Sequence, residues 1–150
     1  METIIRPLFI VMTPVRNEAW VLHAFLRTTS LWADYIIIAD QMSTDGSRDV
    51  YQLYEKVIVI NNTNPNFNEA ERQSMLIAKA REVAAGRDCI LFGLDADEIM
   101  PAHWMQTNDG QRILNSIPGT YFGSNGHNLR LINSTMVILY FIRGYFMMMV

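Results

Sequence analysis

The chain has 150 residues, of which 50% are hydrophobic, 11% aromatic and 18% charged, and its formal net charge is −3 at pH 7. This composition excludes a disordered chain, and the acidic balance argues against binding of nucleic acid, which usually requires basic side chains gathered on one face. The length suits a single domain with a sizeable core.

The single cysteine, Cys89, cannot form a disulfide within one chain, so we expect a reducing compartment and a buried, inert thiol. The N-terminal stretch is interrupted by Arg6 and Pro7 and lacks the cleavage site of a secretory signal. The apolar residues 136–150 include Arg143 and fall short of the roughly 20 residues that cross a bilayer. We therefore expect a cytoplasmic protein, with a peripheral position at the membrane left open.

Four short apolar runs predict buried strands, because none of them alternates between apolar and polar residues. The first run is ended by Pro14, and the second and fourth each lead into acidic side chains. The predicted strands are Leu8–Met12, Tyr35–Ala39, Val57–Ile60 and Ile90–Leu94.

Segments with helical spacing separate these strands. A first helix is predicted from Glu18 onward, with its apolar face formed by Val21, Leu22, Phe25, Leu26 and Thr29. A short second helix is indicated by Val50, Leu53 and Tyr54. A long helix is predicted over Glu69–Ala85, stopped by Gly86, with Leu76, Ala80 and Val83 on one face.

Strands that alternate with helices predict β-α-β units and a mainly parallel sheet between two layers of helices, a three-layer α/β/α domain. Ligands of such sheets bind beyond the carboxyl ends of the strands. The segments expected to meet there are Thr13–Glu18, Ala39–Ser47, the start of the long helix with Arg72, and Leu94–Glu98.

Asp95 and Asp97 follow the fourth strand as an Asp-x-Asp motif. Alternate residues of an extended segment point to opposite sides, so a bend at Ala96 is needed to bring both carboxylates to one ligand. Mg²⁺ and Mn²⁺ prefer oxygen ligands, and phosphate oxygens with water complete their coordination. The alternative is that one of these acids caps the helix after Pro101 or lies in a solvated turn.

The order of these segments resembles the family 2 glycosyltransferases, which have the GT-A fold. The family's first loop carries Pro-x-x-Asn-Glu, which is matched by residues 14–18. Its second strand ends in an acid followed by Ser-Thr-Asp-Gly, matched by Asp40 and residues 43–46, and its Asp-x-Asp is matched by residues 95–97. The resemblance covers roughly Phe9 to Met100 and implies a Rossmann-like GT-A domain.

The resemblance also implies roles for individual residues. Asp40 would accept a hydrogen bond from a uracil-like N–H, Arg72 would approach the nucleotide or its phosphates, and Asp97 would be the metal ligand. The residues implied to bind the nucleotide sugar are Pro14, Val15, Arg16, Glu18, Asp40, Arg72, Asp95 and Ala96. For Asp45 and Ser47 a turn or cap role is favoured over ligand contact, and Arg72 has the alternative of a solvated helix charge.

The implied activity is inverting transfer of a sugar from a nucleotide-diphospho-sugar, UDP-linked by expectation, to a hydroxyl of a saccharide or lipid-linked acceptor. The expected cofactor is Mn²⁺ or Mg²⁺, and the expected context is polysaccharide biosynthesis. The general base stays unassigned, because no Asp or Glu follows Asp109. Two alternatives stay open: a nucleotidyltransferase, and a non-catalytic nucleotide-binding or assembly module that lacks the base.

The C-terminal third combines one helical segment, a turn-rich segment and an apolar run. We expect a helix around Gln111–Ile117, turns at Asn125, Gly126 and Asn128, and an apolar strand over Met136–Ile142. Residues 1–100 are interpreted as the nucleotide-sugar-binding part, and residues 101–150 as the start of an acceptor part that is incomplete at its C-terminus. The apolar tail then packs on the rest of that part, contacts a partner or membrane, or is exchanged in a homodimer.

Overall fold

A single sheet organises the described part of the chain, which in this computed structural model comprises residues 6–66, 68–117, 120–122, 128–130 and 136–140. The strand order is β3-β2-β1-β4-β7-β5-β6, and only β6 is antiparallel to its neighbour. The strands are β1 (Leu8–Val15), β2 (Tyr35–Asp40), β3 (Val57–Asn61), β4 (Cys89–Gly93), β5 (Thr120–Phe122), β6 (Asn128–Arg130) and β7 (Met136–Tyr140). The prediction that the first four strands share one parallel sheet is confirmed.

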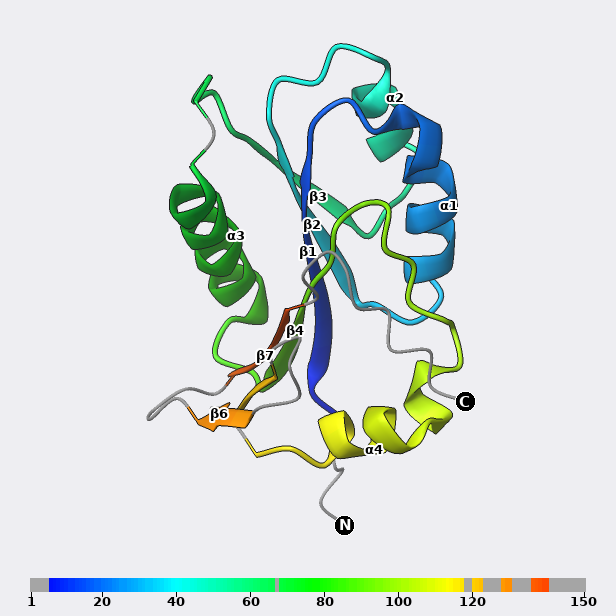
Figure 1. Ribbon diagram of the computed structural model, residues 1–150, viewed down its shortest axis with the longest axis vertical. Coiled ribbons are helices and arrows are strands. Elements are labelled where there is room, and N and C mark those ends of the chain that lie inside the picture. The colour runs from blue at the N-terminus through cyan, green and yellow to red at the C-terminus, as the bar shows by residue number, and fades with distance from the viewer. Residues whose placement is uncertain (1–5, 67, 118–119, 123–127, 131–135, 141–150) are drawn as a thin grey trace.

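Helices cover both faces of this sheet (Figure 1). The helices are α1 (Ala19–Thr29), α2 (Ser47–Tyr51), α3 (Glu69–Ala84), the 3₁₀ turn η1 (Trp104–Gln106) and α4 (Asn108–Leu114). Figure 1 shows α3 on one side of the strands and α1 and α2 on the other. The predicted α/β class, with a Rossmann-like three-layer arrangement, is confirmed.

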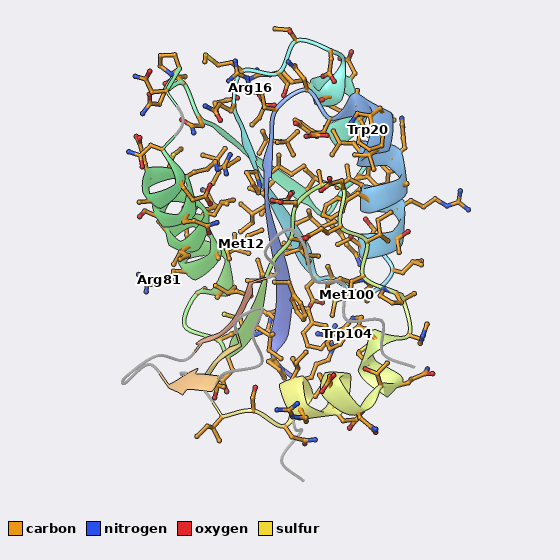
Figure 2. The ribbon with its side chains drawn as sticks, viewed as in Figure 1. Met12, Arg16, Trp20, Arg81, Met100 and Trp104 are labelled. Carbon is orange, nitrogen blue, oxygen red and sulfur yellow. The ribbon has the colours of Figure 1, made fainter. Side chains whose placement is uncertain are left out.

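Alternate residues of β1, β2 and β4 enter two separate cores, as the pleat requires. Ile10 and Met12 of β1 pack with α3, whereas Phe9 and Val11 pack with α1, α2 and η1. Figure 2 shows Met12 on the side of α3 and Trp104 on the opposite side of the sheet. Both faces of the central strands are therefore apolar, which explains why the runs in the sequence show no alternation.

The prediction that Pro14 ends the first strand is wrong, because β1 continues to Val15. The carbonyl of Val15 accepts a hydrogen bond from the amide of Gln41, so this residue bonds toward β2. The neighbouring position, Pro14, therefore faces β4, whose last residue already pairs with Met12. Pro14 lies past the last residue of β1 that pairs with β4, so its missing N–H interrupts no paired residue of that ladder and proline is tolerated there.

Two helix predictions also need correction. The short helix ends at Tyr51, and Leu53 lies beyond it with 68% of its surface exposed. The last helix begins earlier than expected, because the side chain of Thr107 caps it by accepting a hydrogen bond from the amide of Gly110. It ends at Leu114, before the expected end at Ile117.

The apolar C-terminal run is described only as far as Tyr140. Its first part forms β7, which pairs with β4 on one side and β5 on the other, so this part belongs to the domain's own sheet. Asn128, expected in a turn, begins β6. The expected turn residues 125–126 and the tail residues 141–150 lie outside the described residues.

Candidate functional site

The strand order reverses between β1 and β4. From β1 the chain proceeds through β2 to β3 on one side, and α3 then returns it to β4 on the other side of β1. In open α/β sheets, ligands bind beyond the carboxyl ends of the strands at such a reversal. The segments that leave β1 and β4 at this point are the loop of Arg16–Glu18 and the Asp-x-Asp motif.

The Asp-x-Asp motif forms a tight turn. The carbonyl of Asp95 accepts a hydrogen bond from the amide of Glu98 at 2.9 Å, and the carboxylate of Glu98 accepts one from the amide of Asp95 at 3.1 Å. Ala96 is buried in the core cluster that contains α1, whereas Asp95 is half-buried and Asp97 is exposed. The bend that a shared ligand requires is thus present, and the buried side chain of Ala96 anchors it in the core.

The carboxylates of this turn suit Mg²⁺ or Mn²⁺ when other oxygen ligands complete the coordination. Among the described residues, no group of three or more His, Cys, Asp and Glu side chains is placed to hold a metal ion. Carboxylates such as Asp97 are hard oxygen donors, and Mg²⁺ is commonly bound by one or two of them together with substrate phosphates and water. The donor set therefore suits a cation that arrives with a diphosphate.

Asp40 ends β2 with its side chain fully buried. One carboxylate oxygen accepts hydrogen bonds from Arg48 Nε at 2.9 Å and Nη2 at 2.6 Å, and the other accepts one from the hydroxyl of Tyr51 at 2.9 Å. Burial alone would raise the pKa of Asp40, but the hydrogen bonds from Ser43, Arg48 and Tyr51 outweigh it and hold this pKa below its ordinary value. Because none of the side-chain surface of Asp40 is exposed, a nucleobase could reach this carboxylate only if the surrounding side chains moved.

Arg48 was not predicted as a site residue. Its Nη2 also donates to Asn61 Oδ1 at 3.1 Å, so one guanidinium joins the ends of β2 and β3. Half of its side-chain surface stays exposed at this edge. The only signal in the sequence was an arginine eight positions after an acid that ends a buried strand.

The loop after β1 is bound to the loop after β2. Asn17 has a left-handed backbone with φ +57°, and its amide donates to Ser43 Oγ at 3.0 Å. Its side-chain oxygen accepts a hydrogen bond from the amide of Thr44 at 2.8 Å. The Pro-x-x-Asn-Glu and Ser-Thr-Asp-Gly motifs, 26 and 27 residues apart at these contacts, thus form one structural unit.

Asp45 and Ser47 continue this connection. Asp45 Oδ2 accepts a hydrogen bond from the amide of Ala19 at 2.9 Å, and Oδ1 accepts one from the amide of Ser47 at 3.0 Å. The hydroxyl of Ser47 accepts one from the amide of Glu18 at 3.1 Å. Hydrogen bonds from Ser47 and Ala19 lower the pKa of Asp45. The structure gives both Asp45 and Ser47 the capping roles that the sequence favoured.

The predicted residues of the first loop differ in accessibility. Val15 is buried in the core, so only its backbone can face a ligand, and Pro14 is half-buried. Arg16 is exposed, and Figure 2 shows it at the same end of the molecule as Trp20. The carboxylate of Glu18 accepts a hydrogen bond from the indole N–H of Trp20 at 3.0 Å. Trp20, 76% exposed, was not predicted.

Arg72 lies in the first turn of α3, on the other face of the sheet from α1. Its side chain is only 15% exposed and forms an ion pair with Glu69. This burial does not fit the alternative of a solvated helix charge. Asn68 caps the same turn by accepting a hydrogen bond from the amide of Glu71.

A cavity of about 400 Å³ lies elsewhere, at the amino ends of β1 and β2. It is lined by Arg6, Leu8, Asp34, Tyr35 and Arg87. Arg6 and Asp34 are paired there through two hydrogen bonds of 2.8 Å. This cavity contains none of the predicted site residues.

In the described part of the chain, the helices are too short or too polar to cross a membrane.

No protein-family model matches the chain, and a comparison with curated proteins also found no match. The resemblance to family 2 glycosyltransferases therefore stays a prediction that depends on the motifs and their order.

Proposed function

We propose that this domain binds a nucleotide-diphospho-sugar, UDP-linked by preference, and transfers the sugar to a hydroxyl acceptor with inversion. The observation that carries the proposal is the position of the Asp95–Asp97 turn, directly after β4 where the strand order reverses beside β1. A diphosphate at this edge would meet carboxylates able to share a divalent cation with it. The domain would then be a GT-A glycosyltransferase.

The loop after β1 and the loop after β4 would bind different parts of the nucleotide sugar. Arg16 and Glu18 would border the base and ribose, Asp95 would accept a hydrogen bond from a ribose or sugar hydroxyl, and Asp97 would hold the cation. When bound, Mn²⁺ or Mg²⁺ neutralises the charge that develops on the leaving diphosphate. Arg72 would approach the phosphates. Its guanidinium would then either leave Glu69 or bind Glu69 and a phosphate at the same time.

The proposal includes the surroundings of the reaction. The acceptor would be a saccharide or a lipid-linked saccharide, as in polysaccharide biosynthesis. The compartment would be the cytoplasm, at the membrane periphery where the acceptor is lipid-linked.

Titration calorimetry with UDP tests this proposal, with and without Mn²⁺. We expect binding that needs the metal and that is lost in Asp97→Asn. Asp88→Asn is the matched control, because it removes one exposed carboxylate just before the opposite end of β4. Binding that ignores both the metal and Asp97 would remove the metal role, and an equal loss in both variants would show a general charge effect.

The same protein tests the two other functions. A nucleotidyltransferase also places carboxylates beside nucleotide phosphates, and it would release pyrophosphate from a nucleoside triphosphate. The other alternative is a non-catalytic nucleotide-binding or assembly module. It would bind UDP but neither transfer nor hydrolyse the sugar of any donor in a panel screened by thermal shift. A ligand at 100 times its dissociation constant adds about 2.7 kcal/mol of stability, which such a screen detects.

A further inference from the structure

Two neighbouring helices begin at the candidate site without caps of their own. The residue before α1 is Glu18 and the residue before α2 is Gly46, and neither caps its helix with a side-chain hydrogen bond. The first turn of α1 also contains no acidic residue. The amides at a helix start need acceptors, and negative charge is favourable there.

The carboxylate of Asp45 provides a hydrogen-bond acceptor for the first amide of each helix. One of its oxygens accepts from Ala19 in the first turn of α1, and the other accepts from Ser47 at the start of α2. These helices follow different strands, and each of the two amides belongs to the residue directly after one of the two motifs. Asp45 therefore acts as a cap in its own loop and as a tie between two loops.

Further hydrogen bonds between the two loops involve the segment 16–18, which contains the predicted ligand residues Arg16 and Glu18. Ser47 bonds the amide of Glu18, and Asn17 exchanges hydrogen bonds with Ser43 and Thr44. Arg16 and Glu18 are the sequence neighbours of Asn17, which has a left-handed backbone. Both the amide and the side chain of Asn17 are hydrogen-bonded to the opposite loop. We call the contacts of Asn17 and Asp45 with the opposite loop the loop clasp.

We propose that Asp45 is a positioning residue, which holds Arg16 and Glu18 in place for the ligand through the loop clasp without touching the ligand itself. The ligand part of this inference rests on the proposed function, whereas the coupling within the clasp does not. If the loop samples other conformations once the clasp is broken, the apparent affinity falls by the fraction of time spent in the competent one.

The test uses Asp45→Asn, because asparagine is a good helix cap but has a single side-chain oxygen. That oxygen can serve the amide of Ser47 or that of Ala19, but not both in the present geometry. Asp49→Asn is the matched control, since Asp49 is an exposed acid in the first turn of the same helix. Both variants remove one negative charge, and only the first opens the clasp.

Amide hydrogen exchange, followed by NMR without ligand, separates the clasp from simple capping. The amide of Thr44 bonds to Asn17 and not to Asp45, so it reports on the clasp through a hydrogen bond that the substitution does not itself remove. We expect Asp45→Asn to speed exchange of the amides of Ala19 and Thr44 about tenfold, while Asp49→Asn leaves both unchanged. Faster exchange at Ala19 with an unchanged Thr44 would overturn the coupling and leave Asp45 as a local cap.

Calorimetry with UDP and Mn²⁺ provides the ligand readout. We expect Asp45→Asn to bind about tenfold more weakly and Asp49→Asn to bind as the wild type does. Asn17→Ala should weaken binding by a similar factor, and the double variant should be no weaker than either single one, because both open the same clasp. Wild-type affinity in Asp45→Asn, despite a loosened Thr44, would refute the positioning role. If the wild type binds no UDP, the proposed function and the ligand part both fail, and the coupling is still decided by Thr44.

Discussion

The ion pair of Asp40 and Arg48 predicts that replacing one partner lowers the stability of the fold more than replacing the other. Asp40 has no exposed side-chain surface, whereas half of the side chain of Arg48 is exposed. If Asp40 is neutralised, Arg48 can turn into water, but if Arg48 is removed, the carboxylate stays buried with fewer partners. We therefore expect Arg48→Met to destabilise the fold more than Asp40→Asn does.

The structure sets the expected magnitudes. Removing one member of a buried ion pair costs 3–5 kcal/mol, and the exposure of Arg48 places Arg48→Met near the lower end, at about 3 kcal/mol. Asp40→Asn keeps an acceptor for the hydroxyl of Tyr51 and loses the bonds to a charged partner, so we expect about 1–2 kcal/mol. Because the two residues share these bonds, the double variant should cost less than the sum of the single ones.

Urea unfolding at neutral pH measures these differences. Arg27→Met is the control, because Arg27 is an exposed arginine on α1 and should change stability by no more than about 0.5 kcal/mol. A cost for Asp40→Asn equal to or greater than that for Arg48→Met would refute the reasoning. It would show that the buried carboxylate is not the group that depends on its partner.

The same pair predicts how the difference changes with pH. The pKa of Asp40 is lower in the folded state than its ordinary value of 3.8, so its contribution to stability is complete above that value. It is lost as the pH falls below 3.8 and through the folded pKa. The stability gap between the wild type and Asp40→Asn should thus be constant near neutral pH and close in acid. A gap that widens in acid would contradict the lowered pKa.

Three further predictions concern other parts of the fold. Gly110→Ala should destabilise by about 3 kcal/mol in urea unfolding, because its Cβ would lie 1.9 Å from the carbonyl oxygen of Trp104; a change below 0.5 kcal/mol would mean that the turn relaxes freely. Cys89 should resist a thiol reagent at pH 8 in the native state and react in urea, since it is buried and burial raises its pKa to about 11; rapid native labelling would show that β4 opens. Asn68→Ala should cost about 1 kcal/mol, measured by thermal unfolding, because the amide of Glu71 loses its cap; an unchanged midpoint would show that water replaces this bond.

Local sequence patterns were sufficient to predict most of the central sheet. The runs at Leu8, Tyr35 and Ile90 became neighbouring strands, because an apolar segment without alternation is stable only when both of its faces are covered. The run at Val57 became the edge strand β3, which is only partly buried. The position of the Asp-x-Asp motif followed from the same reasoning, since acids directly after a buried strand must emerge at its carboxyl end. These predictions use properties that neighbouring residues share.

Only the tertiary structure decided the partner of each polar side chain. Asp40 is buried against Arg48 because α2 folds back over the end of β2, and Asp45 reaches Ala19 because α1 and α2 begin side by side. The extension of β1 past Pro14 likewise depended on where β4 stops pairing. The physical reason is common to these cases: apolar burial follows the period of the chain, whereas a hydrogen bond depends on which atoms packing brings within about 3 Å of each other.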